Sequence, residues 1–166
     1  DYNMLLIPGV ELQTTGQDTI ILVIDIKKYI DPTLSIEEIV HEAHEQNAIT
    51  VACHPHDKVN EDVHPNMHLW NNRKKYRSLL DVWEIANRED LYDVVAVEKL
   101  NYVANSDFHQ PNHIYSWKTL VRSEKNVEAT KEALRKNTDI GIYLTKSKPS
   151  LTDEKMIPPL VATIFK

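Results

Sequence analysis

The amino-acid sequence predicts an α/β fold with a largely parallel sheet, contained in one domain. Short segments rich in β-branched apolar residues alternate along the chain with segments whose apolar residues recur at helical spacing. Strands that alternate with helices are typical of parallel sheets covered by helices. The 166 residues suffice for one domain with a sizeable core, and 3 glycines leave little room for a flexible linker.

Two strands are predicted near the start of the chain. Residues 4–7 are apolar and run into a tight segment, Pro8-Gly9-Val10, which places Glu11 just past the first strand. Residues 19–26 form the second predicted strand, which is apolar throughout apart from Asp25.

The clearest helix of the sequence begins after Ser35. Ser35 and Glu38 have the spacing of a capping box, in which each side chain bonds the backbone of the other residue. The residues that follow at helical spacing and predict the buried face are Ile36, Ile39, Val40 and Ala43. Asn47 is the predicted end of this helix.

The middle of the chain continues the alternation. A short apolar strand is predicted at residues 49–53, followed by a loop over residues 54–67 that holds two prolines. Residues 71–77 predict a helix, residues 81–86 a strand, and residues 88–98 a further helix with a weaker pattern.

The last part of the chain adds three strands and one helix. Strands are predicted at residues 102–105, 118–121 and 140–144, and a helix at residues 126–136. Residues 147–166 predict an irregular tail whose last apolar residues can pack onto another surface. The predicted domain therefore covers residues 1–146.

Composition limits the class of protein. With 42% hydrophobic and 27% charged residues, and no apolar run near the ~20 residues of a membrane helix, we expect a globular protein away from membranes. The single cysteine, Cys53, excludes an internal disulfide and favours a reducing compartment, which we take as the cytoplasm. The net charge of −6 argues against a broad electrostatic grip on nucleic acid.

The candidate chemistry lies just past the predicted strands. In α/β folds, ligands bind beyond the carboxyl ends of the strands. Glu11 follows the first strand, His54 the third, and Asp107 with His109 the strand that ends near Asn105. Carboxylate and imidazole are ligands that suit Zn²⁺, Mn²⁺ and Fe²⁺, so the joint placement predicts a metal site.

Each of these residues also has an ordinary explanation, as a solvated turn residue or a loop histidine. The remaining histidines carry a weaker prediction. His41 and His44 are three residues apart, whereas the metalloprotease helix motif needs a spacing of four. His113 lies near the Asp107 loop, at the expected rim of the pocket, and Cys53 is expected to be a small core residue.

Four blocks of the sequence resemble the PHP (polymerase and histidinol phosphatase) family in order and spacing. They are Ile7-Pro8-Gly9-Val10-Glu11, Ala52-Cys53-His54-Pro55-His56, Trp83-Glu84-Ile85-Ala86-Asn87-Arg88 and Ala104-Asn105-Ser106-Asp107-Phe108-His109. The resemblance covers about residues 4–145, and the Ser-Asp-x-His and His-Pro blocks are its most specific parts. It implies a distorted seven-stranded β/α barrel that hydrolyses phosphoesters with two or three divalent metal ions.

The resemblance also implies roles for single residues. Glu11 would bridge two metals, His54 would bind one of that pair, Asp107 the other, and His109 a third. Glu84 and Asn87 match a family block that implies no ligand role for them. The metal ions implied are Mn²⁺, Zn²⁺ or Fe²⁺.

Two departures from the family pattern stand out. The family opens with a His-x-His ligand pair and further ligands, for which this sequence has no counterpart. Many members also place a metal-binding histidine in the next strand, where this chain has Ile20. Because the chain starts at Asp1 without an initiator Met, we expect a partial barrel whose amino-terminal strands lie upstream. Exposed strand edges of such a barrel predict pairing with another copy or with that segment.

The leading functional hypothesis is hydrolysis of a phosphomonoester or phosphodiester by metal-activated water. The substrate is a phosphorylated small molecule or nucleotide, held by His56 and Arg88, with Lys118 as a weaker candidate. One alternative is a catalytically incomplete PHP-like module with a structural or protein-binding role. Another is a metallohydrolase of the amidohydrolase kind, which uses similar ligands on C–N or C–O bonds.

Overall fold

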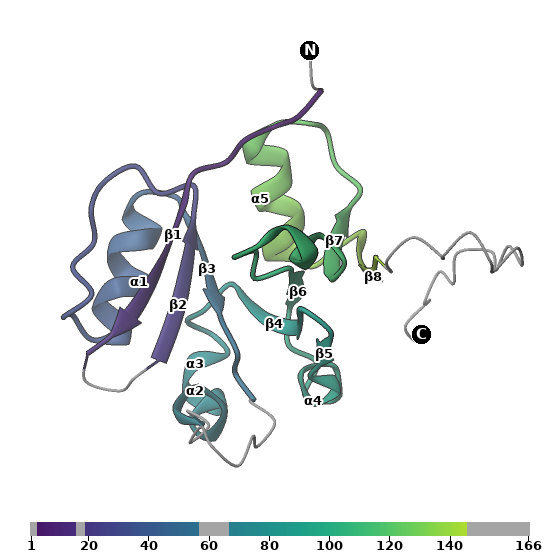
Figure 1. The fold of residues 1–166 in the computed structure, drawn as a ribbon. Helices are drawn as coiled ribbons and strands as arrows, with labels where there is room; N and C mark the ends of the chain where they lie inside the picture. Colours follow the sequence, from purple (N-terminus) through teal and green to yellow (C-terminus); the bar gives the residue numbers. More distant parts are fainter. Residues whose placement is uncertain (1–2, 16–18, 57–66, 146–166) are drawn as a thin grey trace, which may run out of the picture.

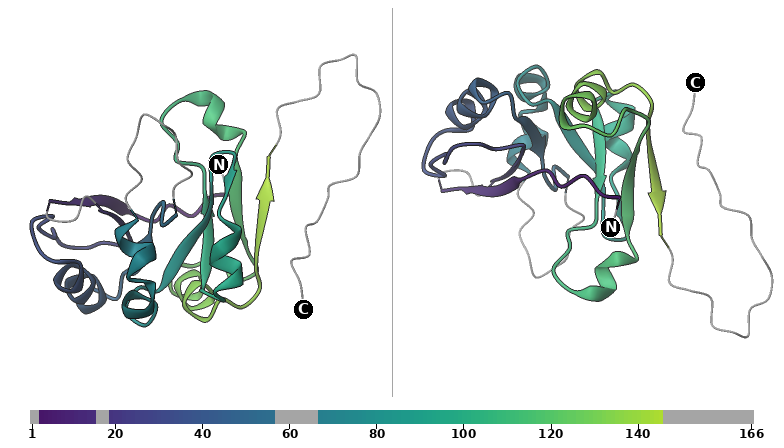
Figure 2. Two further views of the ribbon diagram at one scale, coloured as in Figure 1. Left: turned by 90° about the horizontal axis from the view of Figure 1, so that it is seen from below. Right: turned by 90° about the horizontal axis from the view of Figure 1, so that it is seen from above.

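The computed structural model describes residues 3–15, 19–56 and 67–145, and shows a six-stranded sheet beside a two-stranded one (Figure 1). The strands of the larger sheet are arranged in the order β1-β2-β3-β4-β5, and β6 also pairs with β4. The second sheet consists of β7 and β8, and the two further views show β8 at the outer side of the strands (Figure 2). The predicted tail, residues 147–166, lies outside the described residues.

The first two strands form an antiparallel pair. β1 (Gly9–Thr14) lies opposite β2 (Thr19–Ile24), and Glu11 is paired with Leu22. The prediction of a first strand at residues 4–7 is wrong: Leu6 is largely exposed, and the strand begins only after Pro8, which has no backbone N–H for the ladder. Glu11 therefore lies inside the strand and not past its end.

The capped helix is confirmed. In α1 (Ile36–Glu45), the Ser35 hydroxyl accepts the Glu38 backbone N–H, and the Glu38 carboxylate accepts the Ser35 N–H. Its buried face consists of the four predicted residues, Ile36, Ile39, Val40 and Ala43. The chain then enters β3 (Ile49–Ala52), which is buried along its whole length and antiparallel to β2.

The parallel part of the sheet lies in its middle. Two short helices, α2 (His68–Asn71) and α3 (Arg73–Tyr76), connect β3 to β4 (Val82–Asn87), which runs parallel to β3. β4 also runs parallel to β6 (Tyr102–Asn105). The helix predicted at residues 88–98 is shorter than expected: its place is taken by β5 (Asp90–Leu91) and α4 (Asp93–Val97).

The second sheet lies beside β6. β7 (Trp117–Val121), which follows the 3₁₀ helix η1 (Pro111–Ile114), pairs antiparallel with β8 (Ile140–Leu144). The Thr119 hydroxyl accepts the Ala104 N–H and donates to the Ala104 carbonyl, both at 2.8 Å. One side chain thus joins the two sheets. Between β7 and β8 lies α5 (Val127–Lys136), capped by Asn126.

Side-chain alternation divides the six-stranded sheet into two apolar faces. One face, with Ile21, Val23 and Ala52, packs against the buried side of α1. The other face is formed by Ile49, Val51, Cys53, Val82 and Val103 with Leu134 of α5. We call this second face the inner face, because the candidate site lies at its end.

The prediction of an α/β fold is confirmed, and its sheet is mixed. The pairs β3–β4 and β4–β6 are parallel, while β1–β2, β2–β3 and β4–β5 are antiparallel. Parallel neighbours need a long crossover connection between them. Only four residues separate β1 from β2, so these two strands have to be antiparallel. Within the described ranges no ladder joins β1 to β8, and the strands form an open arc. None of the described helices is long and apolar enough to cross a membrane.

Candidate functional site

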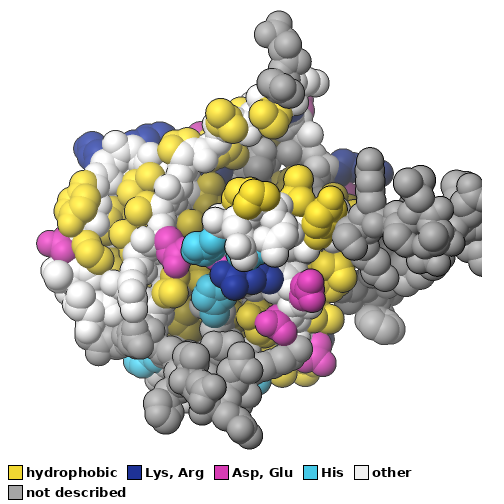
Figure 3. Space-filling model, in the orientation of Figure 1, with side chains coloured by type: hydrophobic (Ala, Val, Ile, Leu, Met, Phe, Trp, Pro, Cys, Tyr) yellow, Lys and Arg dark blue, Asp and Glu magenta, His cyan; other side chains and the backbone are white. Residues whose placement is uncertain are grey.

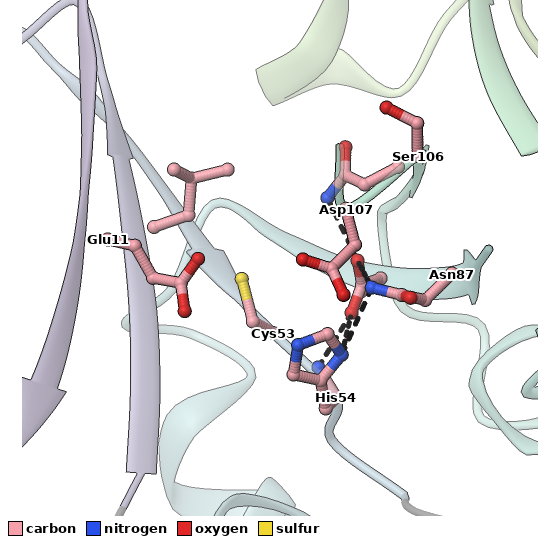
Figure 4. A pocket seen from close by; sticks show the side chains of 9 residues that line it. Glu11, Cys53, His54, Asn87, Ser106 and Asp107 are labelled. Carbon is pink, nitrogen blue, oxygen red and sulfur yellow. Dashed lines mark hydrogen bonds and ion pairs between the residues drawn. The ribbon is translucent and has the colours of Figure 1, made fainter. Parts of the chain in front are cut away.

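A polar pocket opens at the carboxyl ends of β3, β4 and β6, on the inner face of the sheet (Figure 4). Its volume is about 220 Å³. The residues that line it are Glu11, Leu22, Cys53, His54, Glu84, Asn87, Asn105, Ser106 and Asp107. The apolar residues of the inner face lie towards the other end of the same strands, so the pocket is the polar end of an otherwise apolar surface.

Glu11 reaches the pocket through strand alternation. Leu12 is buried with Ile21 against the helical side of the sheet, so its neighbour Glu11 points to the inner face. Figure 4 shows its carboxylate on the opposite side of the pocket from Asp107. Glu11 therefore lies in one pocket with His54 and Asp107, as predicted, but it belongs to a strand and not to a turn.

His54 is held by a buried carboxylate. Its backbone N–H donates to Glu84 Oε2 at 2.7 Å, and its ring Nδ1 lies 2.8 Å from the same oxygen. The second ring nitrogen, Nε2, is turned into the pocket (Figure 4). A histidine whose Nδ1–H is taken by a carboxylate presents an Nε2 lone pair, which is the usual arrangement of a metal-binding histidine.

A residue with a positive, left-handed φ angle follows each of the three parallel strands. His54 after β3, Arg88 after β4 and Asp107 after β6 have φ values of 45°, 47° and 45°. A non-glycine residue in this region costs about 1 kcal/mol or more, so the surrounding structure has to hold it. The Arg88 N–H bonds the Asn105 carbonyl at 3.2 Å, for example, and Trp117 N–H bonds the Arg88 carbonyl at 3.0 Å.

Asp107 lies across the pocket from Glu11, and both of its carboxylate oxygens already have an ion-pair partner. Its Oδ2 is 2.7 Å from the Arg88 guanidinium, and its Oδ1 is 3.1 Å from His109 Nδ1. The Arg88 side chain is 49% exposed and lies next to the pocket through its contact with Asp107. The contact of Arg88 with an anionic substrate stays a prediction.

Like Arg88, the remaining predicted site residues lie outside the pocket lining. His109 is 66% exposed and contacts Asp107 from outside. His56 packs edge-on against Trp70, with ring centroids 5.2 Å apart. Lys118 bonds the Ser116 hydroxyl and carbonyl. The face drawn in Figure 3 nevertheless shows histidine and Lys or Arg side chains gathered beside Asp and Glu side chains.

The electrostatics of the pocket are dominated by carboxylates. Burial alone would lower the pKa of His54, but the hydrogen bond to Glu84 and the charges of Glu84, Asp107 and Glu11 outweigh it and raise that pKa. Burial, together with the same three carboxylates, raises the pKa of the Cys53 thiol. The site therefore favours bound positive charge and keeps Cys53 a neutral thiol.

Sequence analysis assigned no ligand role to the residue at the centre of the site, Glu84, and did not find its contacts. Besides its place in a block that resembles the PHP family, its signal was a carboxylate inside a largely apolar strand, which is costly unless every oxygen is satisfied. Asn105, which also contacts this carboxylate, was predicted only as the end of a strand and as a member of a block that resembles the PHP family.

The donor chemistry of the pocket fits a divalent cation, although no ready-made ligand cluster is present. Glu11, Asp107 and His54 Nε2 offer the oxygen and nitrogen ligands that Mn²⁺, Zn²⁺ and Fe²⁺ accept. Over residues 3–15, 19–56 and 67–145, no three His, Cys, Asp or Glu side chains are grouped closely enough to hold a metal ion as they stand. A cation at Asp107 would compete with Arg88 for Oδ2 or share the carboxylate with it.

Comparison with known proteins supports the fold alone. No family model matches the chain, and no curated protein matches it in sequence. The fold is similar to the crystal structure of a two-domain protein from Bacteroides vulgatus ATCC 8482 that contains a predicted PHP-like metal-dependent phosphoesterase, with a TM-score of 0.64 and 20% identity. The two share a fold. The match covers 86% of this chain and 45% of the other, so this chain spans less than half the length of that protein.

Proposed function

We propose that this chain is part of a PHP-like metal-dependent phosphoesterase, which hydrolyses a phosphomonoester or phosphodiester with metal-activated water. The observation that carries the proposal is His54: its Nδ1 is held by buried Glu84, and its Nε2 faces a pocket shared with Glu11 and Asp107. The shared fold supports the same class of enzyme, because the Bacteroides vulgatus protein with this fold contains a predicted PHP-like metal-dependent phosphoesterase. The open arc of strands would then be a portion of a distorted barrel.

In this proposal Glu11, His54 and Asp107 hold divalent cations, and His109 binds a further one from the rim. When bound, a cation of this kind lowers the pKa of its water and neutralises phosphate charge. The chain's own residues explain why the cation is needed. Glu11, Glu84 and Asp107 make the pocket repel a free phosphate, so an anionic substrate enters only after positive charge has been supplied.

In this proposal Arg88 orients the phosphate. Its guanidinium can donate two parallel hydrogen bonds to phosphate oxygens at the mouth of the pocket. A volume of about 220 Å³ is below the ~300 Å³ at which small-molecule pockets usually start, so we expect only the phosphate group to enter. The rest of the substrate would lie outside, in contact with the rim that includes His109.

The test is metal binding and turnover in the Asp107→Ala variant. Calorimetry with Mn²⁺ and Zn²⁺, and hydrolysis of an aryl phosphate and a bis-aryl phosphate, should show at least about a tenfold loss of metal affinity and a loss of turnover. His41→Gln is the matched control, because His41 is exposed on α1. If Asp107→Ala keeps the metal content and the activity of the wild type, the proposed site is wrong.

A second candidate function is a catalytically incomplete module with a structural or protein-binding role. It is favoured by the absence of a ready three-ligand group in the described ranges and by the Arg88–Asp107 ion pair. Elemental analysis of protein purified without added metal separates the two functions. A stoichiometric transition metal supports the enzyme, and a folded protein that neither retains nor binds metal supports the module. Amides and lactones in the substrate panel test the amidohydrolase alternative.

A further inference from the structure

Glu84 is the most completely buried carboxylate of the pocket and lies in the middle of β4. Its side chain is 1% exposed. Oε2 faces His54, with the backbone N–H at 2.7 Å and Nδ1 at 2.8 Å. Oε1 faces the side-chain amides of Asn87 at 3.0 Å and Asn105 at 3.1 Å. Each oxygen of the carboxylate therefore has two contacts, and the three contacting residues come from the ends of β3, β4 and β6.

A bulge in β4 makes this arrangement possible. Glu84 and Asn87 are three residues apart and would point to opposite faces of a regular strand. The register between β4 and β6 shifts between Glu84 and Ala86, so the strand gains one residue there. Asn87 is thereby turned onto the inner face beside Glu84, as expected for a bulge that re-aims a side chain next to a site.

Four partners leave this carboxylate little capacity to bind a metal itself. A carboxylate accepts about four hydrogen bonds, and Glu84 accepts four. Asn87 Nδ2 also lies 3.2 Å from His54 Nδ1, but two donors cannot bond each other. The shorter contacts indicate that His54 Nδ1–H donates to Glu84 Oε2 and that the Asn87 amide donates to Oε1. The lone pair of the imidazole then lies on Nε2, towards the pocket.

We propose that Glu84 is a positioning residue, which fixes the orientation of His54 and its Nδ1–H tautomer so that Nε2 is presented to a divalent cation. Asn87 and Asn105 clamp the opposite oxygen, so the carboxylate cannot rotate away from the imidazole. The role of the cation rests on the proposed function, whereas the tautomer is a property of the chain itself and can be measured without metal.

A second carboxylate–histidine pair of the same protein provides the control. His44 Nε2 lies 3.0 Å from Asp81 Oδ2, and the same oxygen accepts the Thr50 N–H and hydroxyl. Asp81 directly precedes β4, at the opposite end of the strand from the pocket. Asp81→Asn thus removes a comparable hydrogen-bonded charge without touching His54.

The experiment is nitrogen NMR of protein labelled at histidine, recorded without metal above the titration range of imidazole. His54→Gln and His44→Gln assign the two ring signals. We expect His54 to carry its proton on Nδ1 in the wild type and in Asp81→Asn. In Glu84→Leu, which has no acceptor, we expect the Nε2–H form that free imidazole favours in water. Glu84→Gln keeps one acceptor oxygen and should give a mixture of the two forms.

Metal affinity gives the second readout. Mn²⁺ affinity measured by calorimetry should fall about tenfold in Glu84→Gln and stay unchanged in Asp81→Asn. A wild-type His54 protonated on Nε2, or a folded Glu84→Leu with the wild-type tautomer, overturns the positioning role. If Glu84→Leu does not fold, Glu84→Gln decides: wild-type tautomer and wild-type affinity together overturn the role. A wild type that binds no metal contradicts the proposed function instead, and the tautomers still decide the role of Glu84.

Discussion

The two ends of the six-stranded sheet carry the same kinds of charged side chain but satisfy them in different ways. At the amino end of β3, Lys131 donates to Asp25 at 2.5 Å, to Glu128 at 2.8 Å and to the Asn47 carbonyl at 3.0 Å. At the carboxyl end, carboxylates line a pocket together with the free nitrogen of one histidine. A charged group closed off by protein partners supports the fold, and one with an open direction is available to a ligand.

At the amino end of β3, Lys131 and its three partners form a closed network around a buried charge. The Lys131 side chain is 1% exposed, although it comes from a helix that is otherwise largely polar. Burial alone would lower the pKa of Lys131, but its bonds to Asp25 and Glu128 outweigh it and raise the pKa. Lys131 therefore stays charged and joins α5 to the segment after β2 and to Asn47, two residues past the end of α1.

The largest expected effect is a loss of stability when the Lys131 network at the amino end of β3 is removed. Lys131→Met leaves the Asp25 carboxylate, which is 10% exposed, without its closest cation. We expect the free energy of unfolding in urea to fall by about 3 kcal/mol, with metal affinity at the pocket unchanged. Lys136→Met is the control, because Lys136 pairs with Glu132 on the exposed side of α5 and should cost less than about 0.5 kcal/mol. Equal losses in the two variants would contradict the closed network.

The second effect is a pH dependence that comes from Asp81. Burial raises the pKa of Asp81, but hydrogen bonds from His44 and Thr50 outweigh it and lower the pKa below its usual value. A carboxyl whose pKa is lower in the folded state adds stability above its unfolded pKa near ~4, and this is lost as pH falls through the folded pKa. Asp81→Asn should cost about 2 kcal/mol at neutral pH. The difference from wild type should shrink below about pH 4 in urea titrations. A difference that stays constant with pH would exclude the charge of Asp81 as its source.

The elements that the sequence predicted best are those whose signals are local. The Ser35–Glu38 capping box and the helical spacing after it fix α1, and Asn126 fixes the start of α5. The strands at residues 102–105 and 140–144 are also found with the predicted bounds. Each of these depends on neighbours within one turn or one strand, so no knowledge of the fold was needed.

The parts of the site that escaped prediction depend on contacts between distant segments. Glu84 contacts His54, which lies 30 residues earlier, and Asn105, which lies 21 residues later. The bulge that turns Asn87 inward exists only in the pairing of β4 with β6. The first strand was misplaced for a similar reason: the apolar residues 4–7 have no partner strand among the described residues, whereas residues 9–14 lie opposite β2 along their whole length.

The smallest expected effect is a gain in stability, and it comes from Glu11 in the pocket at the carboxyl end of β3. Glu11 is exposed and shares its pocket with two groups of like charge, Glu84 and Asp107. Glu11→Gln should raise the free energy of unfolding by about 0.3 kcal/mol in the metal-free protein, and lower Mn²⁺ affinity by about tenfold. Glu42→Gln, an exposed position on α1, should change neither quantity. A loss of stability in Glu11→Gln would mean that both ends of the sheet use their charges to support the fold. A gain joined to weaker binding would mean that the carboxyl end keeps an unfavourable charge because a cation needs it.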